Sequence, residues 1–246
     1  MAYLSYIMST PDSWHSWLRL AVGLVVGVYL ARQVRKPSRW IGRPFAWTMN
    51  RSHSNLTDWG LQHVQIEKNF IVLDIGCGGG RTIQKLAAIA TEGKVYGVDY
   101  AQGSVAASRN KNAAAISDGR VNIQQGSVSQ LPLADNTFDL ATAIETQYYW
   151  PDLPNDMREV LRVLKPGGTL LIIAETYRGG RGSQITAPIM RLLGSSSLSA
   201  EDQRDLFTNA GYVDVQIFEE QKKGWICAKG RKPSSHSESD TQRRIS

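Results

Sequence analysis

The sequence predicts an α/β fold in which an open, mostly parallel sheet carries helices on both faces. Residues 71–75, Ile-Val-Leu-Asp-Ile, form a short apolar run typical of a strand covered on both sides. A glycine-rich turn and a helix over 81–90 follow this run. A second strand over 94–98 then ends in Asp99, about twenty residues past the last glycine of the turn. Strands that alternate with helices in this way favour a parallel sheet.

The turn Gly76-Cys77-Gly78-Gly79-Gly80 indicates a binding site for a nucleotide-type cofactor. Glycines let the backbone turn sharply and approach a ligand that a Cβ atom would exclude. The helix that follows directs its positive end toward such a ligand. The carboxylate of Asp99 suits the two hydroxyls of a ribose, which several nucleotide cofactors share, so the turn alone does not distinguish between them.

Five more strands complete the predicted sheet. The third leads into Gly126-Ser127-Val128, turn formers at 135–136 open the fourth, and the fifth follows a helix end and a Lys-Pro-Gly-Gly turn at 165–168. A capped helix is expected over 199–210, before a hairpin with its turn at 221–224. The expected strands lie over 121–125, 138–144, the residues after 168, 213–218 and 225–229.

Four motifs together resemble the class I S-adenosylmethionine-dependent methyltransferases. They are Asp74-Ile75-Gly76-Cys77-Gly78-Gly79-Gly80, Asp99, Leu131-Pro132 with Phe138-Asp139, and Leu164-Lys165-Pro166-Gly167-Gly168. Their order and spacing match over roughly residues 50–230, most closely the small-molecule enzymes of the ubiquinone- and menaquinone-biosynthesis type. The resemblance implies a Rossmann-like sheet of seven strands, the last antiparallel, and S-adenosylmethionine as the cofactor.

A nicotinamide-dependent dehydrogenase is the main alternative within this fold. Such enzymes more often show G-x-G-x-x-G without an acid two residues before the first glycine, where this chain has Asp74. A carboxylate at that place suits the cationic amino-acid part of S-adenosylmethionine. A protein that binds the cofactor without turnover, as a membrane-docked partner or scaffold, is an alternative of a different class.

The resemblance also implies the cofactor-binding residues. Gly76, Gly78 and Gly80 allow close approach of the backbone, Asp74 binds the methionine ammonium directly or through water, and Asp99 binds the ribose. Many relatives have an aspartate after the glycine at 126, whereas this chain has Ser127. The full set of expected cofactor contacts is Asp74, Gly76, Cys77, Gly78, Gly80, Asp99, Tyr100, Ser127, Val128 and Glu145.

The residues after the fourth strand are the best candidates for the acceptor side. Glu145-Thr146-Gln147-Tyr148-Tyr149-Trp150 follows that strand at the edge of the sheet where ligands bind in open α/β folds. Glu145 is a candidate general base or counter-charge, and Tyr148 is a candidate contact to substrate. The alternative is that these aromatic residues only seal the edge of the sheet. His53, in a lead-in over 48–61, is the third catalytic candidate, with Trp59 and His63 in second rank.

Charge and composition bear on the partners and exclude some of them. Residues 1–70 hold eight Lys and Arg against three Asp and Glu, whereas residues 71–229 hold sixteen against seventeen. A nearly neutral catalytic core argues against a nucleic-acid substrate, which would favour a basic stripe with aromatic residues. The two cysteines and four histidines have no metal-ligand spacing, so no metal is expected.

The N-terminal residues predict a hydrophobic helix over 14–31 that associates with a membrane. Residues 20–31 carry no charge, Trp14 and Trp17 precede them, and five basic residues follow between 32 and 43. That basic flank would hold the catalytic domain in the cytoplasm. A helix that packs on the domain or lies along a membrane surface is the alternative, with a soluble cytoplasmic protein as one outcome.

Three segments follow from these patterns. Residues 1–43 form the hydrophobic helix with its basic flank, 44–229 the methyltransferase domain, and 230–246 a polar tail expected to be disordered. Within the domain, residues 178–197 are rich in glycine and serine and suggest a flap over the substrate, with a short helix over 185–193, or an ordinary surface excursion. A membrane anchor would favour an apolar or lipid-associated methyl acceptor.

Overall fold

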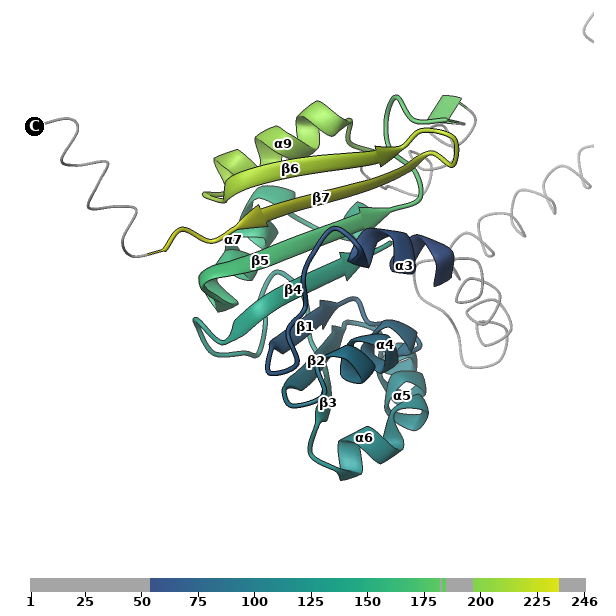
Figure 1. Ribbon diagram of the computed structural model, residues 1–246, viewed down its shortest axis with the longest axis vertical. Coiled ribbons are helices and arrows are strands. Elements are labelled where there is room, and N and C mark those ends of the chain that lie inside the picture. The colour runs from purple at the N-terminus through teal and green to yellow at the C-terminus, as the bar shows by residue number, and fades with distance from the viewer. Residues whose placement is uncertain (1–53, 182, 185–196, 235–246) are drawn as a thin grey trace, which may run out of the picture. The chain divides into compact units, whose positions relative to one another are not determined.

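The computed structural model describes residues 54–181, 183–184 and 197–234. Seven strands form one sheet in the order β3-β2-β1-β4-β5-β7-β6, and β7 runs antiparallel to both of its neighbours while all other pairs are parallel (Figure 1). The predicted seven-stranded, mostly parallel sheet is therefore confirmed. Its strands are β1 (Ile71–Ile75), β2 (Lys94–Asp99), β3 (Val121–Gln125), β4 (Phe138–Ile144), β5 (Leu164–Ala174), β6 (Val213–Glu220) and β7 (Trp225–Arg231).

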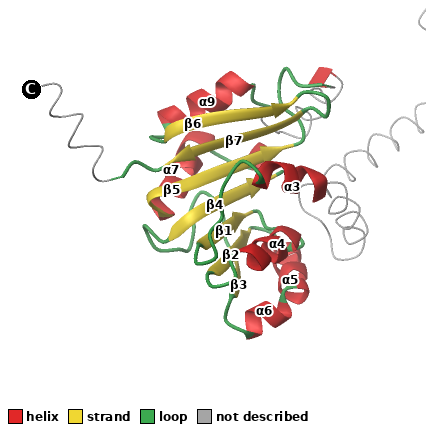
Figure 2. Cartoon of the chain, viewed as in Figure 1, coloured by secondary structure: helices red, strands yellow, loops and turns green. Residues whose placement is uncertain are grey.

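Helices cover both faces of the sheet (Figure 2). The described helices are α3 (Ser54–Leu61), α4 (Arg81–Ile89), α5 (Gln102–Lys111), α6 (Ala113–Ser117), the 3-10 turn η1 (Gln147–Tyr149), α7 (Leu153–Val163) and α9 (Ala200–Asn209). One core joins α3, α4 and α5 to the sheet, and the other joins α7 and α9 to its opposite face. Neighbouring residues of β1 show the division, because Val72 belongs to the first core and Leu73 to the second.

The strand order fixes where a ligand can bind. β1 pairs with β2 on one side and with β4 on the other, so the chain leaves the centre of the sheet in opposite directions at this point. The carboxyl ends of β1, β2 and β4 meet at one edge there. Open α/β sheets bind their ligands in the crevice at such a reversal of strand order.

Two differences between the predicted and the observed boundaries follow from backbone pairing. Leu164 pairs with Phe138 and Thr169 with Leu140, so the Lys-Pro-Gly-Gly residues bulge out of β5 opposite a single residue of β4. At the other end of the domain, β7 continues past Lys229 to Arg231, and the backbone of Lys232 exchanges hydrogen bonds of 2.9 and 2.8 Å with Gly167 and Gly168. The first residues of the predicted tail are thus ordered, because the bulge offers their backbone a partner.

Several predicted segments lie outside the described residues. They are the hydrophobic helix over 14–31, His53 and the short helix over 185–193. Among the residues that are described, no helix combines the length and the apolar character that crossing a membrane requires.

Candidate functional site

The glycine turn after β1 is held tightly against the ends of the neighbouring strands. The N–H groups of Gly76 and Cys77 both donate to the carbonyl of Val98, at 2.7 and 3.2 Å. Gly76 has a φ of 72°, and a Cβ atom there would lie 2.3 Å from Cγ2 of Thr146. Only glycine satisfies both the positive φ and the close contact, so the turn is fixed between β2 and the residues that follow β4.

Asp99 lies at the end of β2 with its carboxylate oriented by the backbone. Oδ2 accepts the N–H of Gly78 at 2.9 Å, and Oδ1 accepts the N–H of Ala101 at 2.8 Å. Burial raises the pKa of Asp99, and these bonds oppose the rise. Because each oxygen has a second lone pair, the carboxylate can still accept hydrogen bonds from a ligand's hydroxyls.

Asp74 is the second buried acid of the site, and its side chain is 2% exposed. The hydroxyl of Thr142 on β4 donates to Oδ1 at 2.8 Å. Burial raises the pKa of Asp74 to about 7, the Thr142 bond opposes this change, and the negative charge of Asp99 adds to it. Within the described residues neither acid has a Lys or Arg ion-pair partner. The two carboxylates therefore form a negative site that a cationic ligand would stabilise.

Cys77 has a packing role in the turn. Its side chain is 6% exposed. Its Sγ packs over Gly97, since a Cβ atom added to Gly97 would lie 3.1 Å from this sulfur. Burial raises the pKa of the Cys77 thiol well above its ordinary value, and the charges of Asp74 and Asp99 raise it further. The thiolate is thus disfavoured, which argues against a reactive cysteine.

The residues expected around the adenine lie at the ends of β2 and β3. Tyr100 follows Asp99 directly and is 48% exposed, while Val128 is buried in the core on the α7 side. Ser127 is exposed, and its hydroxyl accepts the N–H of Ser129 at 3.2 Å. An exposed ring beside a fixed carboxylate is suited to packing on a planar group.

Glu145 directly follows β4 and has a left-handed conformation, with a φ of 60°. Its N–H donates to the carbonyl of Ile173 at 2.9 Å, and its Oε1 accepts the Tyr148 hydroxyl at 3.1 Å and the N–H of Glu175. A positive φ is rare for residues other than glycine and is typical of functional or strained positions. The sequence placed Glu145 at this edge but gave no signal of the strain.

The aromatic residues after Glu145 lie mostly inside the protein. Tyr148 and Trp150 are each 7% exposed, and Trp150 packs in the α7-side core, whereas Tyr149 is only partly buried. Trp59 and His63 pack with Phe218 and Trp225 into a ring cluster, in which the rings of His63 and Phe218 stack at 4.0 Å. The burial of Tyr148 and Trp150 favours the alternative that the sequence left open, in which these aromatic residues seal the edge of the sheet.

Sequence reasoning missed two threonines that support the acids and the turn. Thr142 holds Asp74, and Thr146 packs on Gly76 while its hydroxyl donates to the carbonyl of Ile75 at 3.1 Å. A signal existed for Thr142, because it is a polar residue in the middle of the otherwise apolar run Leu-Ala-Thr-Ala-Ile. No such signal marked Thr146.

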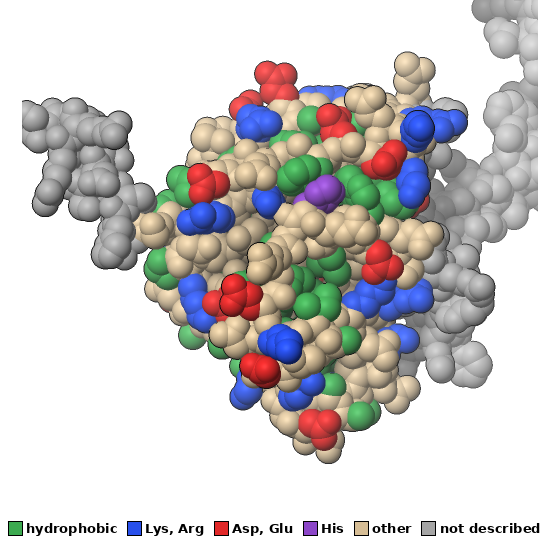
Figure 3. Space-filling view, in the orientation of Figure 1, with side chains coloured by type: hydrophobic (Ala, Val, Ile, Leu, Met, Phe, Trp, Pro, Cys, Tyr) green, Lys and Arg blue, Asp and Glu red, His purple; other side chains and the backbone are tan. Residues whose placement is uncertain are grey.

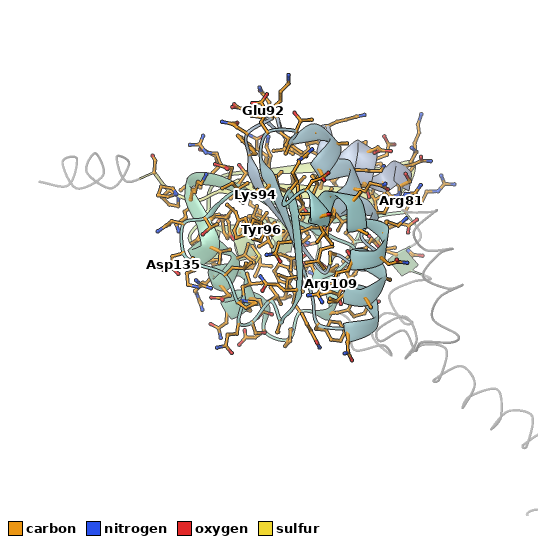
Figure 4. All side chains as sticks on the ribbon, turned by 90° about the horizontal axis from the view of Figure 1, so that it is seen from below. Arg81, Glu92, Lys94, Tyr96, Arg109 and Asp135 are labelled. Atoms are coloured by element: carbon orange, nitrogen blue, oxygen red, sulfur yellow. The ribbon has the colours of Figure 1, made fainter. Side chains whose placement is uncertain are left out.

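Among the described residues away from the glycine turn, the hollow at the β3 edge is lined by no Asp, Glu, His or Cys. Lys, Arg, Asp and Glu are interspersed over the described part of the face in Figure 3, without a stripe of one sign. Lys94, Tyr96 and Arg109, which are labelled in Figure 4, line a hollow of about 450 Å³ to which none of residues 76–80 contributes. In the same described ranges no three His, Cys, Asp or Glu residues are grouped as metal ligands.

Comparison with known proteins agrees with the geometry of this site. A family model described as "Methyltransferase domain" matches residues 73–172. The demethylmenaquinone methyltransferase of Symbiobacterium thermophilum is 36% identical over 42% of this chain and 41% of its own length. That of Shouchella clausii is 31% identical over 68% of this chain and 80% of its own length.

Solved structures show the same fold at lower identity. Phosphoethanolamine N-methyltransferase 2 of Haemonchus contortus, solved in complex with S-adenosyl-L-methionine, has a TM-score of 0.64 at 16% identity, over 74% of this chain and 53% of that chain. This chain spans about half the length of most of the curated relatives that it matches. From its motifs, its sheet and its relatives together, the chain belongs to the class I S-adenosylmethionine-dependent methyltransferases, whose cofactor is S-adenosylmethionine.

Proposed function

We propose that this chain transfers a methyl group from S-adenosylmethionine to a small acceptor that is apolar or lipid-associated. The observation that carries the proposal is the pair of buried carboxylates, Asp74 and Asp99, beside a glycine turn and without a cationic partner among the described residues. The cofactor offers an ammonium for the first acid and ribose hydroxyls for the second. In a nicotinamide-dependent enzyme the glycine turn would instead face the anionic pyrophosphate of the dinucleotide.

The proposed roles of the other residues follow from their positions. Gly78 lets the cofactor approach the backbone, because a Cβ atom there would meet no other group closer than 4.0 Å. Gly76 and Gly80 shape the turn through packing instead, since a Cβ atom would lie 2.3 Å from Thr146 at the first and 2.4 Å from Ser108 at the second. Tyr100, which follows β2, packs beside the adenine. Cys77 after β1, and Ser127 and Val128 after β3, are the other expected contacts to the cofactor. His53 is retained as a third catalytic candidate from the sequence.

The chemistry needs little from the protein beyond positioning. When bound, S-adenosylmethionine supplies a methyl group already activated by its sulfonium, so an acceptor in line behind the carbon needs only to be oriented and deprotonated. Glu145, at the edge of the sheet nearest the turn, takes the proton of the acceptor or balances the positive charge of the donor. Asp74, Asp99 and the glycine turn would hold S-adenosylmethionine, which would supply the methyl group and remain as S-adenosylhomocysteine after transfer.

Calorimetric titration of the full-length chain tests the cofactor half of the proposal. S-adenosylmethionine and S-adenosylhomocysteine should bind, NAD should not, and Asp99→Ala should abolish binding because it removes the oriented acceptor of the ribose hydroxyls. Ser129→Ala, an exposed substitution outside the proposed contacts, is the control. Tight binding of NAD, or full cofactor affinity in Asp99→Ala, would contradict the proposal.

The acceptor class rests on the relatives and on residues 14–31. The similar proteins include demethylmenaquinone methyltransferases and a sterol 4-C-methyltransferase of Caenorhabditis elegans, which is 31% identical over 55% of this chain. A panel of a short-chain demethylmenaquinol, a sterol and a water-soluble phenol, with methyl-labelled cofactor, separates lipophilic from polar acceptors. Transfer to the phenol alone would contradict the proposed acceptor class.

Membrane association through residues 14–31, with the catalytic domain on the cytoplasmic side, is the second half of the acceptor argument. The uncharged run over 20–31 and its basic flank support it. Deletion of residues 1–43 should move the protein from the membrane pellet to the supernatant. Pelleting that is unchanged by the deletion would contradict the association.

A further inference from the structure

The segment after β4 connects three parts of the site's edge. The hydroxyl of Thr146 donates to the end of β1, and the N–H of Glu145 donates to β5. The side-chain amide of Gln147 exchanges two hydrogen bonds, of 3.2 and 2.6 Å, with the amide of Gln203 on α9. Both glutamines are buried. This set of bonds keeps Glu145 in its left-handed conformation beside the glycine turn.

The hydroxyl of Tyr148 lies at the centre of this edge and has a single proton to donate. The N–H of Thr176 donates to it at 3.3 Å. Its own proton can go to Glu145 Oε1 at 3.1 Å or to the carbonyl of Thr176 at 3.3 Å. The shorter distance and the charge of the carboxylate favour Glu145 as the acceptor.

The carboxylate of Glu145 is consequently fixed through one of its oxygens. Oε1 accepts the N–H of Glu175 as well as the hydroxyl of Tyr148. Two donors on the same oxygen define the rotation of the carboxylate about its last torsion. Tyr148 itself is 7% exposed, and its hydroxyl is directed to Glu145.

We propose that Tyr148 is a positioning residue for methyl transfer, whose hydroxyl holds the carboxylate of Glu145 in the orientation that faces the acceptor. The inference rests on the proposed function, in which Glu145 is the acceptor-side acid. It replaces the expected contact between Tyr148 and substrate by an indirect role. General acid–base groups contribute about 10²- to 10⁴-fold to a rate, so loss of their orientation has a measurable effect.

A double-mutant cycle on the full-length chain tests this role. Turnover of demethylmenaquinol and the affinity for S-adenosylhomocysteine are measured for Tyr148→Phe, Glu145→Gln and the double variant. Tyr148→Phe should lower kcat about 10- to 100-fold and change the affinity for S-adenosylhomocysteine less than about twofold. In the Glu145→Gln background the same substitution should have almost no further effect, because the group that it orients is altered.

Tyr212→Phe is the matched control. Tyr212 is 3% exposed, and its hydroxyl donates to the carbonyl of Met157 at 3.0 Å, so its loss removes a buried hydrogen bond away from the site. This variant should keep the unsubstituted kcat. As a second measurement, 3-fluorotyrosine at position 148 keeps the ring and strengthens the donor, and it should shift the acid limb of the kcat profile to lower pH.

Each outcome separates the two proposals. Equal kcat in Tyr148→Phe and Tyr212→Phe, independent effects in the double variant, or an acid limb unmoved by 3-fluorotyrosine would overturn the positioning role alone. Binding of S-adenosylhomocysteine without methylation of any acceptor in the panel by the unsubstituted chain would overturn the proposed acceptor chemistry, and the positioning role with it.

Discussion

The affinity for S-adenosylmethionine should rise with pH between pH 5.5 and 7.5, and Asp74 should be the cause. Burial raises the pKa of Asp74 from its ordinary value of 3.8 to about 7, so this carboxyl is mostly protonated at pH 6 in the cofactor-free chain. The ammonium of the cofactor would favour the charged form. Binding below pH 7 therefore expels a proton, and this cost disappears as the pH rises through the raised pKa.

The size of the effect follows from the two pKa values. If binding returns Asp74 to its ordinary pKa, each pH unit below 7 weakens affinity roughly tenfold, or about 1.4 kcal/mol. The dissociation constant should then be roughly eightfold lower at pH 7.5 than at pH 6.0. About 0.9 proton should be released per cofactor at pH 6.0 and about 0.2 at pH 7.5, by the same linkage.

Isothermal titration in two buffers of different ionisation enthalpy measures both quantities. Asp74→Asn should bind more weakly at neutral pH and should lose the proton release, because no titrating group remains at that position. Asp156→Asn changes a buried carboxyl on α7, on the opposite face of the sheet, and is the matched control. This variant should keep the proton release on cofactor binding. Equal affinity of the unsubstituted chain at both pH values, or proton release that persists in Asp74→Asn, would refute the reasoning.

Two further substitutions test the turn and a helix start. Gly76→Ala should abolish cofactor binding and destabilise the fold by about 1–3 kcal/mol, because it combines strain at φ 72° with a 2.3 Å contact to Thr146. Gly119→Ala is the control, because Gly119 has a φ of 71° but nothing within 4 Å of the added Cβ atom, so this variant carries the strain alone. Equal losses of stability in both variants would contradict the contact argument. Ser199→Ala removes the capping box of α9 and should lower Tm by about 2–4 °C in thermal unfolding, for about 1 kcal/mol. Ser117→Ala, an exposed substitution in a helix, is the control and should leave Tm unchanged. Equal Tm values for Ser199→Ala and Ser117→Ala would argue against the cap.

Local patterns were sufficient to predict most of the sheet. β1, β3 and β4 begin and end where the apolar runs and turn formers placed them, and the hairpin of β6 and β7 has its turn at 221–224. Apolar runs bounded by Gly, Asp and Asn carry their own boundaries. The bulge in β5 had no such signal, because its Lys-Pro-Gly-Gly residues form a turn in isolation and are kept within the strand only by pairing with β4 and β7.

The site was predictable in its composition but not in its connections. The motif alone identified the glycines and both acids as site residues. The groups that determine their protonation and orientation come from other parts of the chain. Thr142 donates to Asp74, and the backbone of Glu175 and Thr176 donates to Glu145 and Tyr148. Sequence spacing carries no information about contacts between groups that lie 28 to 68 residues apart in the chain.

The place of β7 in the sheet has a consequence for how the chain is made. β7 is the last of the seven described strands to be synthesised, yet it lies between β5 and β6, which do not pair with each other. Until Arg231 has left the ribosome, β5 presents an unpaired apolar edge that includes Leu170 and Ile172. The sheet is therefore completed only once β7 has been synthesised, and a chain truncated before residue 225 would leave an edge prone to pairing with other chains.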